Sequence, residues 1–508
     1  MAQSYGLLIG GEWVDRNGHK TIESRSPVNG GLVATFPRAG RADVKKAVKA
    51  ALDAFPGWRA TPAPARGQIL LEAARILKQR KERIARVVAR EMGKVIAEAR
   101  GDVQEAIDFY EYASGEGRRM FGITTPSELP NKLLMTRREP LGPVGLITPW
   151  NFPVAIPGWK SGAALIAGNT CVFKPASTTP TCAAEFVGAL TDAGLPPGVM
   201  NLLVGPGEEV GEAIVDDERV RGVSFTGGVD AGRTVYQHAA ARLISCGLEL
   251  GGKNPVIVMD DANEDLALEG ILFGAFGTAG QRCTATSRVL LHAKIYDRFL
   301  DQLVARVEKL RLGDPVDEST DVGPVHGEGQ LKKILGYIDV GKKEGAELVT
   351  GGRRADAGKL RRGTFVKPTI FATEHGTRIS TEEIFGPVLS VIKIGSLKEA
   401  IRVANGVIYG LSSAIYTDNV NTAFKAVDQL EAGITYINAP TIGAEIGVPF
   451  GGVKATGNGT REAGPTAIEE FTAQKTVVIE YSGRLQKAQI DTAQVSGEGG
   501  ARKNARRN

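Results

Sequence analysis

The first quarter of the chain carries its apolar residues mainly at helical spacing. After a short β-rich entry with a turn at residues 29–31, apolar positions recur every three or four residues from 43 to about 115. Pro62 and Pro64 mark a boundary between the first helix and the second. The helices predicted from this spacing are 43–55, 64–80, 83–93 and 94–115.

From residue 144 onward, short apolar runs alternate with helical stretches. The runs are typical of buried strands, and each is followed by a helix after a brief connection. Such alternation predicts an α/β fold with a doubly wound parallel sheet. The predicted strands are 144–148, 170–174, 199–204, 220–225 and 246–250, and the predicted helices are 158–167, 178–193, 208–215 and 230–241.

A second α/β unit follows residue 250, and a further strand is predicted after Val388. Residues 353–362 form a surface loop rich in Gly, Lys and Arg, and residues 439–464 form a long glycine-punctuated loop suited to a pocket wall. The other strands predicted here are 256–259, 288–291, 346–350 and 433–438, and the helices are 266–276, 293–310 and 327–345.

Two extended segments lie outside these units. Residues 132–138 stand between the helical region and the first strand of the parallel sheet, and residues 477–481 form the last predicted strand. The first segment is either a hairpin that leaves its domain to pair with another subunit or an ordinary surface hairpin.

Length and charge exclude several classes of protein. A chain of 508 residues predicts two or three domains, because a single core stops growing at roughly 250–300 residues. The net charge of +5 comes mainly from residues 483–508, with six basic and two acidic residues, so a nucleic-acid partner is not expected. No run of 18 apolar residues and no signal-like N-terminus occur, so neither a membrane partner nor secretion is expected.

The four cysteines suggest a reducing compartment and one reactive thiol. Their spacing matches no CxxC or zinc pattern, so we expect a cytoplasmic protein without a metal site. Cys283 lies among small residues that allow close approach, and it is the candidate nucleophile. A working thiol needs a base or a positive field, for which Glu249 and Arg282 are the candidates. The alternative is that Cys283 is a small buried apolar residue.

Three predicted strand ends carry residues suited to a ligand. They are Asn151, Lys174 and the turn 225–228, with Gly232 close behind. Ligands of doubly wound sheets bind at the carboxyl ends of the strands, and a helix N-terminus there attracts phosphate. A plain strand-to-helix turn is the alternative for 225–228.

Seven motifs in this order resemble the aldehyde dehydrogenase superfamily over nearly the whole chain. They are PWNFP (149–153), FKPAS (173–177), FTGG (225–228), LELGGKNP (248–255), GQRC (280–283), EEIFGPV (382–388) and PFGGVKATG (449–457). The resemblance implies a doubly wound, Rossmann-like cofactor domain, an α/β catalytic domain and a small β oligomerisation hairpin. The implied division is a cofactor-binding domain at 1–120 and 141–251, a catalytic domain at 252–451, oligomerisation segments at 121–140 and 467–482, and a basic tail at 483–508.

The resemblance also implies catalytic roles. Cys283 would attack the aldehyde carbon, and the Asn151 amide and the Cys283 backbone N–H would hold the oxyanion. Glu249 would activate the water that hydrolyses the resulting thioester. Some members carry a relay glutamate where this chain has Ala473, so Glu249 is expected to act without that relay.

The cofactor implied is NAD(P). Glu383 would hold the nicotinamide ribose, with Phe385 beside the ring. NAD-preferring members usually carry glutamate where this chain has Ser177, so NADP is the preferred cofactor here and NAD the alternative. The implied cofactor residues are Thr148, Pro149, Trp150, Lys174, Ser177, Thr226, Gly227, Gly228, Gly232, Leu250, Glu383 and Phe385.

For the substrate, the GQRCTATSR stretch and the loop 438–452 resemble members that oxidise short semialdehydes, especially 2,5-dioxopentanoate. Arg282 would bind a distal carboxylate of the substrate or turn away into an ion pair. Succinate semialdehyde and non-phosphorylating glyceraldehyde-3-phosphate oxidation remain alternatives, as do a catalytically silent relative and a cysteine esterase. A homodimer or homotetramer is implied. The implied substrate residues are Phe152, Trp159, Arg282, Thr284 and Phe450.

Overall fold

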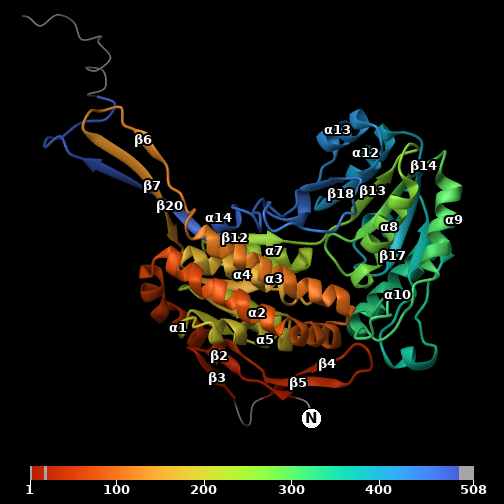
Figure 1. Ribbon diagram of the computed structural model, residues 1–508, viewed down its shortest axis with the longest axis horizontal. Coiled ribbons are helices and arrows are strands. Elements are labelled where there is room, and N and C mark those ends of the chain that lie inside the picture. Colours follow the sequence, from red (N-terminus) through yellow and green to blue (C-terminus); the bar gives the residue numbers. More distant parts are fainter. Residues whose placement is uncertain (1–2, 16–19, 491–508) are drawn as a thin grey trace, which may run out of the picture.

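The computed structural model describes residues 3–15 and 20–490, which contain two seven-stranded sheets and two three-stranded ones. Figure 1 shows the two large sheets with their helices side by side and a slender arm that leaves the body. Residues 491–508, most of the predicted basic tail, lie outside the described residues. Within the described ranges, no helix combines the length and the apolar character that a bilayer crossing needs.

The first large sheet is doubly wound, as predicted. Its order is β12-β11-β8-β9-β10-β2-β3, and its first five strands run parallel. The chain runs from the central β8 through β9 to β10 on one side and then returns to β11 and β12 on the other. The strands are β2 (Leu7–Ile9), β3 (Glu12–Val14), β8 (Pro143–Ile147), β9 (Thr170–Lys174), β10 (Met200–Leu202), β11 (Gly222–Thr226) and β12 (Ser245–Glu249).

Among the helices around this sheet, the predicted break between 64–80 and 83–93 was wrong. Residues 64–80 and 83–93 belong to one helix, α2, because Lys81 and Glu82 are good helix formers and the apolar face continues through buried Ile84 and Val88. The helices are α1 (Arg41–Ala60), α2 (Ala63–Met92), α3 (Ile96–Glu116), α4 (Ala155–Ala167), α5 (Pro180–Asp192), α6 (Glu212–Asp216) and α7 (Val229–Ala241), with a π-helical turn at Gly207–Gly211.

The second large sheet has the order β15-β16-β17-β14-β13-β18-β19, and every neighbouring pair except β15-β16 is parallel. The sequence patterns had assigned no elements to β16, β18, α12 and α13. The strands are β13 (Asn254–Val258), β14 (Thr286–His292), β15 (Glu347–Thr350), β16 (Thr369–Ala372), β17 (Val388–Ile394), β18 (Ser412–Tyr416) and β19 (Ile434–Ile437), and the helices are α8 (Glu264–Phe276), α9 (Tyr296–Val307), α10 (Gly327–Lys343), α11 (Arg378–Thr381), α12 (Leu397–Asn405) and α13 (Val420–Gln429).

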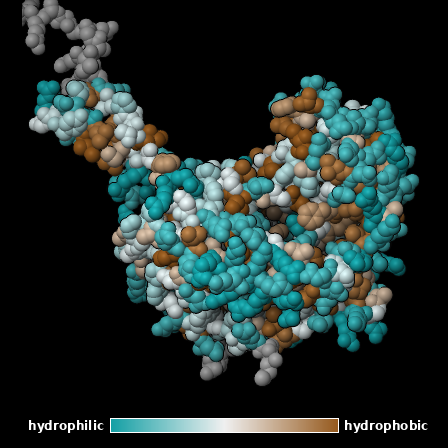
Figure 2. Space-filling model, in the orientation of Figure 1, coloured by the Kyte–Doolittle hydropathy of each residue, from teal (hydrophilic) through white to brown (hydrophobic). Residues whose placement is uncertain are grey.

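The arm consists of β6 (Thr124–Pro126), β7 (Lys132–Pro140) and β20 (Thr472–Glu480), which follows the short helix α14 (Ala467–Glu470). The predicted strand 477–481 therefore begins five residues earlier, because β20 pairs with β7 along its whole length. Figure 2 shows hydrophobic residues on the arm and over α13. Val478 and Ile479 in β20, for example, are 55% and 44% exposed. The remaining small sheet consists of β1 (Gln3–Ser4), β5 (Leu32–Pro37) and β4 (Thr21–Arg25).

The two large sheets are joined by residues 250–253, between β12 and β13. Glu249 is the last residue of β12, whereas Cys283 lies just before β14, the neighbour of β13. Asn254 at the start of β13 donates from Nδ2 to the Cys283 carbonyl at 2.7 Å. The carboxyl end of the first sheet therefore meets the amino end of the second at these two residues.

Candidate active site

A left-handed turn carries the chain from α8 to Cys283. Thr278, Ala279 and Gly280 have consecutive φ values of 52°, 51° and 69°. This conformation is unfavourable for residues with a Cβ, so surrounding contacts must hold it in place. At position 280 glycine is required for a second reason, because a Cβ there would lie 2.3 Å from the Gly386 carbonyl oxygen.

Glu98, on α3, supplies the contacts that hold the turn. Its carboxylate accepts from the Thr278 N–H at 2.8 and 3.0 Å and from the Thr278 hydroxyl at 3.0 Å. It also forms a 3.2 Å ion pair with Arg282. The sequence had treated α3 as scaffold, so this role of Glu98 was missed.

Asn151 lies beside the segment that leads to the cysteine. Its side-chain Nδ2 donates to the Gln281 carbonyl oxygen at 3.1 Å, and Asn151 is only 3% exposed. Gln281 in turn donates from Nε2 to the Thr278 carbonyl oxygen. The Asn151 amide is therefore held next to the backbone of the predicted nucleophile.

Cys283 and Glu249 line one cavity of about 140 Å³. Trp159 and Phe450, which both line the cavity, pack edge to face with their ring centroids 5.2 Å apart. Among the predicted site residues, the lining includes Phe152, Trp159, Thr226, Glu249, Leu250, Arg282, Cys283, Thr284 and Phe450, and it further includes Glu105, Ala155, Ile156, Gly443, Ala444 and Glu462.

The thiol is surrounded by negative rather than positive charge. Burial and the carboxylates of Glu249 and Glu383 raise the pKa of Cys283 to about 12, while the Thr284 N–H lowers it. Cys283 is partly exposed, whereas Cys171, Cys182 and Cys246 are buried. Arg282 was the sequence-based candidate for a positive field at the thiol, but its guanidinium pairs with Glu98.

Glu249 is buried without hydrogen-bond partners among the described residues. Both of its carboxylate oxygens lack one, and Glu249 is 4% exposed. Burial, and then the nearby Glu462 carboxylate, raise the pKa of Glu249 well above its ordinary value. A Cβ at position 451 would lie 2.6 Å from Glu249 Oε1, so Gly451 leaves the space that this carboxyl needs. An unpaired, weakly acidic carboxyl is suited to accept a proton from water.

Arg282 forms the ion pair that the sequence left open as one alternative, and it also lines the cavity. Its Nη2 pairs with Glu98 and its Nε donates to the Thr278 hydroxyl at 3.0 Å, yet the residue also lines the cavity. The guanidinium lies 5.4 Å from the centre of the Phe152 ring, whose other neighbour is the Lys94 ammonium at 3.4 Å. Among the described residues, no hydrogen bond engages Nη1. In the described part of the chain, Arg282 is the one cation in the lining, since Lys94 lies outside it and pairs with Asp102 at 2.8 Å. Glu105 also lines the cavity, and burial raises its pKa to about 8.

Three of the predicted cofactor residues lie at strand ends on one edge of the first sheet. Thr148 follows β8, Lys174 ends β9 and Thr226 ends β11, and these strands are neighbours in register. The hydroxyls of Thr148 and Thr226 are buried without a partner among the described residues. Gly228 caps α7, and a Cβ there would meet no atom within 4 Å. Unpaired hydroxyls beside an open helix N-terminus suit a ribose and a phosphate.

Three of the predicted cofactor residues, Trp150, Glu383 and Phe385, lie near the segment that joins the two large sheets. Trp150 packs edge to face on Phe385 at 5.4 Å, and it stacks on His326 at 4.4 Å. Glu383 accepts from the Gly252 N–H at 3.0 Å. His326 carried no sequence signal, since its contact with Trp150 joins segments that are distant in the chain.

At the end of β9, Lys174 Nζ donates to the Pro175 carbonyl oxygen, and burial lowers the pKa of Lys174 to about 8. The Ser177 hydroxyl donates to the Gly205 carbonyl oxygen at 2.6 Å. Gly232 gives Leu250 room, since a Cβ at position 232 would lie 2.4 Å from Leu250 Cδ2.

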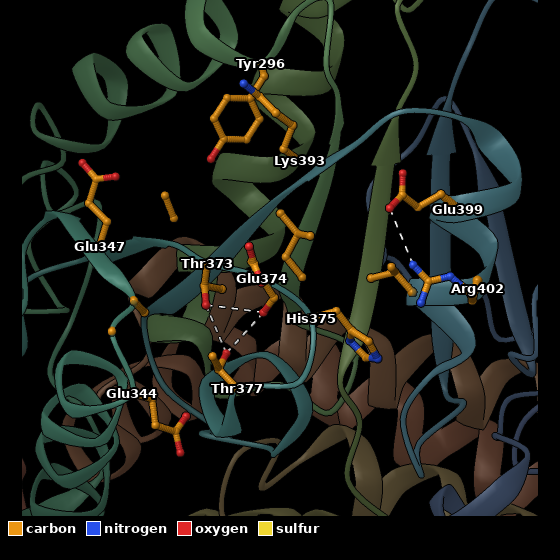
Figure 3. A pocket seen from close by; sticks show the side chains of 15 residues that line it. Tyr296, Glu344, Glu347, Thr373, Glu374, His375, Thr377, Lys393, Glu399 and Arg402 are labelled. Carbon is orange, nitrogen blue, oxygen red and sulfur yellow. Dashed lines mark hydrogen bonds and ion pairs between the residues drawn. The ribbon is translucent and has the colours of Figure 1, made fainter.

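A larger cavity, of about 830 Å³, lies at the carboxyl end of β16 and β17. Figure 3 shows its charged and polar side chains, among them Glu399 paired with Arg402 at 3.6 Å. It holds none of the predicted catalytic or cofactor residues. The chemistry is therefore assigned to the smaller cavity around Cys283.

A sequence model of the aldehyde dehydrogenase family matches residues 13–477. The chain belongs to the aldehyde dehydrogenase family. The family and the fold expected from the seven motifs are thereby confirmed. An alpha-ketoglutaric semialdehyde dehydrogenase from Bacillus subtilis is 43% identical over 479 residues, which cover 94% of this chain and 98% of the relative.

Two further comparisons agree. A 2,5-dioxopentanoate dehydrogenase from Saccharolobus solfataricus is 41% identical over 470 residues, which cover 92% of the present chain and 97% of the relative. The crystal structure of a betaine aldehyde dehydrogenase from Staphylococcus aureus in complex with NAD⁺ has a TM-score of 0.92 and 34% identity, and the match covers 94% of this chain and 96% of the other.

Because Glu249 raises the pKa of Cys283, Glu249→Gln should make the thiol more reactive. At about pH 9, iodoacetamide should alkylate Cys283 faster in this variant, by about tenfold for each unit by which the pKa falls. Mass spectrometry of the tryptic peptides gives the rate, and the three buried cysteines serve as internal controls. Slower alkylation would mean that Glu249 acts as the base for the thiol.

Proposed function

We propose that this aldehyde dehydrogenase oxidises a short carboxylate-bearing semialdehyde, such as 2,5-dioxopentanoate, to the dicarboxylic acid with NADP. The observation that carries the proposal is the position of Arg282 in the lining of the cavity that holds Cys283 and Glu249. Arg282 provides a guanidinium there for the distal carboxylate. The names of the relatives at 43% and 41% identity support the same substrate class.

In the first half-reaction, the Cys283 thiol loses its proton to water, and the sulfur attacks the aldehyde carbon to form a thiohemiacetal oxyanion. The Asn151 side-chain amide and the Cys283 backbone N–H stabilise the oxyanion, a contribution worth about 3–4 kcal/mol per donor in comparable sites. A bound oxidised nicotinamide supplies the hydride acceptor. Loss of hydride from the thiohemiacetal carbon leaves a thioester on Cys283.

In the second half-reaction, Glu249 takes a proton from a water molecule, whose oxygen attacks the thioester carbon. The carbon–sulfur bond breaks, the acid leaves, and the Cys283 thiolate takes up a proton again. The unpaired oxygens of Glu249 favour this role, because no internal hydrogen bond competes with the water.

The direct test is a screen of semialdehydes with NADP and NAD, read as absorbance at about 340 nm. We expect 2,5-dioxopentanoate to give the highest kcat/KM and Cys283→Ala to abolish turnover, because the thioester can no longer form. Cys246→Ala, at a buried cysteine outside the cavity, is the matched control. Turnover that survives Cys283→Ala, or a higher kcat/KM for uncharged aldehydes, would contradict the proposal.

Arg282→Ala should raise KM for 2,5-dioxopentanoate by about tenfold to a hundredfold, because it removes one charge-assisted hydrogen bond. An uncharged aldehyde of equal length should be affected much less. Arg298→Ala, which removes an exposed arginine paired with Glu264, is the control variant. An equal increase in KM for both aldehydes would mean that Arg282 only supports the turn at Thr278.

The preference for NADP rests on Ser177 and Lys174. With no carboxylate at position 177, nothing there repels a 2′-phosphate, and the Lys174 ammonium attracts it. We expect kcat/KM to favour NADP and Ser177→Glu to reverse the preference by about tenfold or more. Since burial sets the pKa of Lys174 at about 8, the advantage of NADP should shrink as pH rises through that value. A preference of the unaltered enzyme for NAD above about tenfold would contradict this.

We further propose a homodimer or homotetramer in the cytoplasm. Exposed apolar residues on the arm support pairing through segments 121–140 and 467–482. The four free thiols support a reducing compartment. Residues 1–120 and 141–251 are proposed to bind the cofactor, and residues 252–451 to form the catalytic domain.

A further inference from the structure

The Arg282 guanidinium lies over an aromatic ring that the steps above do not use. Phe273 of α8 places its ring centre 5.4 Å from the guanidinium carbon, the same distance as the Phe152 ring. The Arg282 side chain is only 12% exposed, whereas Phe273 is 51% exposed and lies outside the lining of the cavity that holds Cys283. Phe273 therefore reaches the cavity through Arg282 rather than directly.

The two aromatic rings near Arg282 are not equivalent. The Lys94 ammonium lies 3.4 Å from the centre of the Phe152 ring, closer than the Arg282 guanidinium does. In the part of the chain that the structure describes, no second cation lies over the Phe273 ring. The negative face of an aromatic ring attracts a cation, and more strongly where water is excluded. Phe273 is therefore the ring that serves Arg282 alone.

Gly277 makes room for the two side chains that hold Arg282. A Cβ at position 277 would lie 2.8 Å from Glu98 Oε1 and 3.4 Å from Cδ2 of Phe273. The Gly277 N–H also donates to the Phe273 carbonyl oxygen, where α8 ends. The Glu98 carboxylate and the Phe273 ring therefore meet at the start of the turn that leads to Cys283.

These contacts hold the guanidinium and leave one of its nitrogens free for a ligand. Nη2 pairs with Glu98 at 3.2 Å, and Nε donates to the Thr278 hydroxyl at 3.0 Å. The Phe273 ring adds an attraction of a different kind, because a guanidinium also stacks on aromatic faces. A long side chain that is already held in place loses less freedom when it binds a carboxylate, so binding is stronger.

We propose that Phe273 is a positioning residue for substrate selection, because its ring holds the Arg282 guanidinium ready for the distal carboxylate of a semialdehyde. The inference rests on the proposed function, in which Arg282 binds that carboxylate. Loss of the ring would leave the charge of Arg282 but release its position. The effect should fall on KM for aldehydes that carry a carboxylate, and kcat should stay nearly unchanged because Phe273 lies outside the cavity.

Phe273→Leu should raise KM for 2,5-dioxopentanoate by about threefold to tenfold, because leucine keeps an apolar side chain but has no aromatic face. Phe273→Tyr, which keeps that face, should retain the wild-type KM. Phe424→Leu, at a phenylalanine of α13 that is 63% exposed, is the matched control. An unchanged KM in Phe273→Leu, or an equal increase for an uncharged aldehyde of the same length, would overturn the proposal.

A double-mutant cycle shows whether Phe273 acts through Arg282. In an Arg282→Ala background, Phe273→Leu should raise KM no further, because the cation that the ring holds is already gone. Increases that multiply would overturn the proposal. Should Phe273→Leu fail to fold, a trifluorinated phenylalanine in place of Phe273 keeps the ring but withdraws electron density from its face, and it must raise KM for the semialdehyde alone. An unaffected KM in Arg282→Ala would instead contradict the proposed function, whatever the Phe273 variants show.

Discussion

The carboxylate of Glu98 is the contact on which the geometry of this site depends. Three successive residues shortly before Cys283 adopt the left-handed conformation, which costs free energy at Thr278 and Ala279 because both carry a Cβ. Glu98 offsets that cost by accepting the Thr278 N–H and hydroxyl, and it also orients Arg282. One half-buried carboxylate thus holds the turn before Cys283 and orients a cation beside the cavity.

The second constraint is the close contact between the two large sheets. Gly252 lies so near Cys283 that a Cβ at position 252 would be 2.5 Å from the Cys283 carbonyl oxygen. A Cβ at Gly251 would lie 2.3 Å from Glu383 Oε2. The glycines of the LELGGKNP motif therefore allow Glu249, Cys283 and Glu383 to lie close together.

The site keeps its buried charge in carboxyls. Glu249 and Glu383 raise the pKa of Cys283, and Glu462 raises that of Glu249, while Lys160 opposes this shift. A buried carboxylate with a raised pKa binds a proton more readily than an exposed one, which suits a group that takes a proton from water. The same carboxyls would disfavour a permanently ionised thiol in the free protein.

The sequence by itself determined the α/β order, the doubly wound first sheet, the family, and Cys283, Glu249 and Asn151 as candidates. These depend on local periodicity and on motifs of adjacent residues, which are visible without a fold. Boundaries set by long-range pairing were less accessible, since β20 extends to Thr472 only because β7 lies beside it.

Only the tertiary structure decided the surroundings of those candidates. Glu98 reaches Thr278 across 180 residues, and Glu462 reaches Lys160 across 302 residues. In the sequence, Glu98 and Glu105 are polar positions of a scaffold helix, and Glu470 is one of two neighbouring acids. Packing between elements that are remote in the chain makes Glu98 a support for the turn before Cys283 and Glu105 part of the cavity wall. It also places the Glu470 carboxyl against Gly247 of β12. No local pattern encodes such contacts, because they exist only once the two sheets have met.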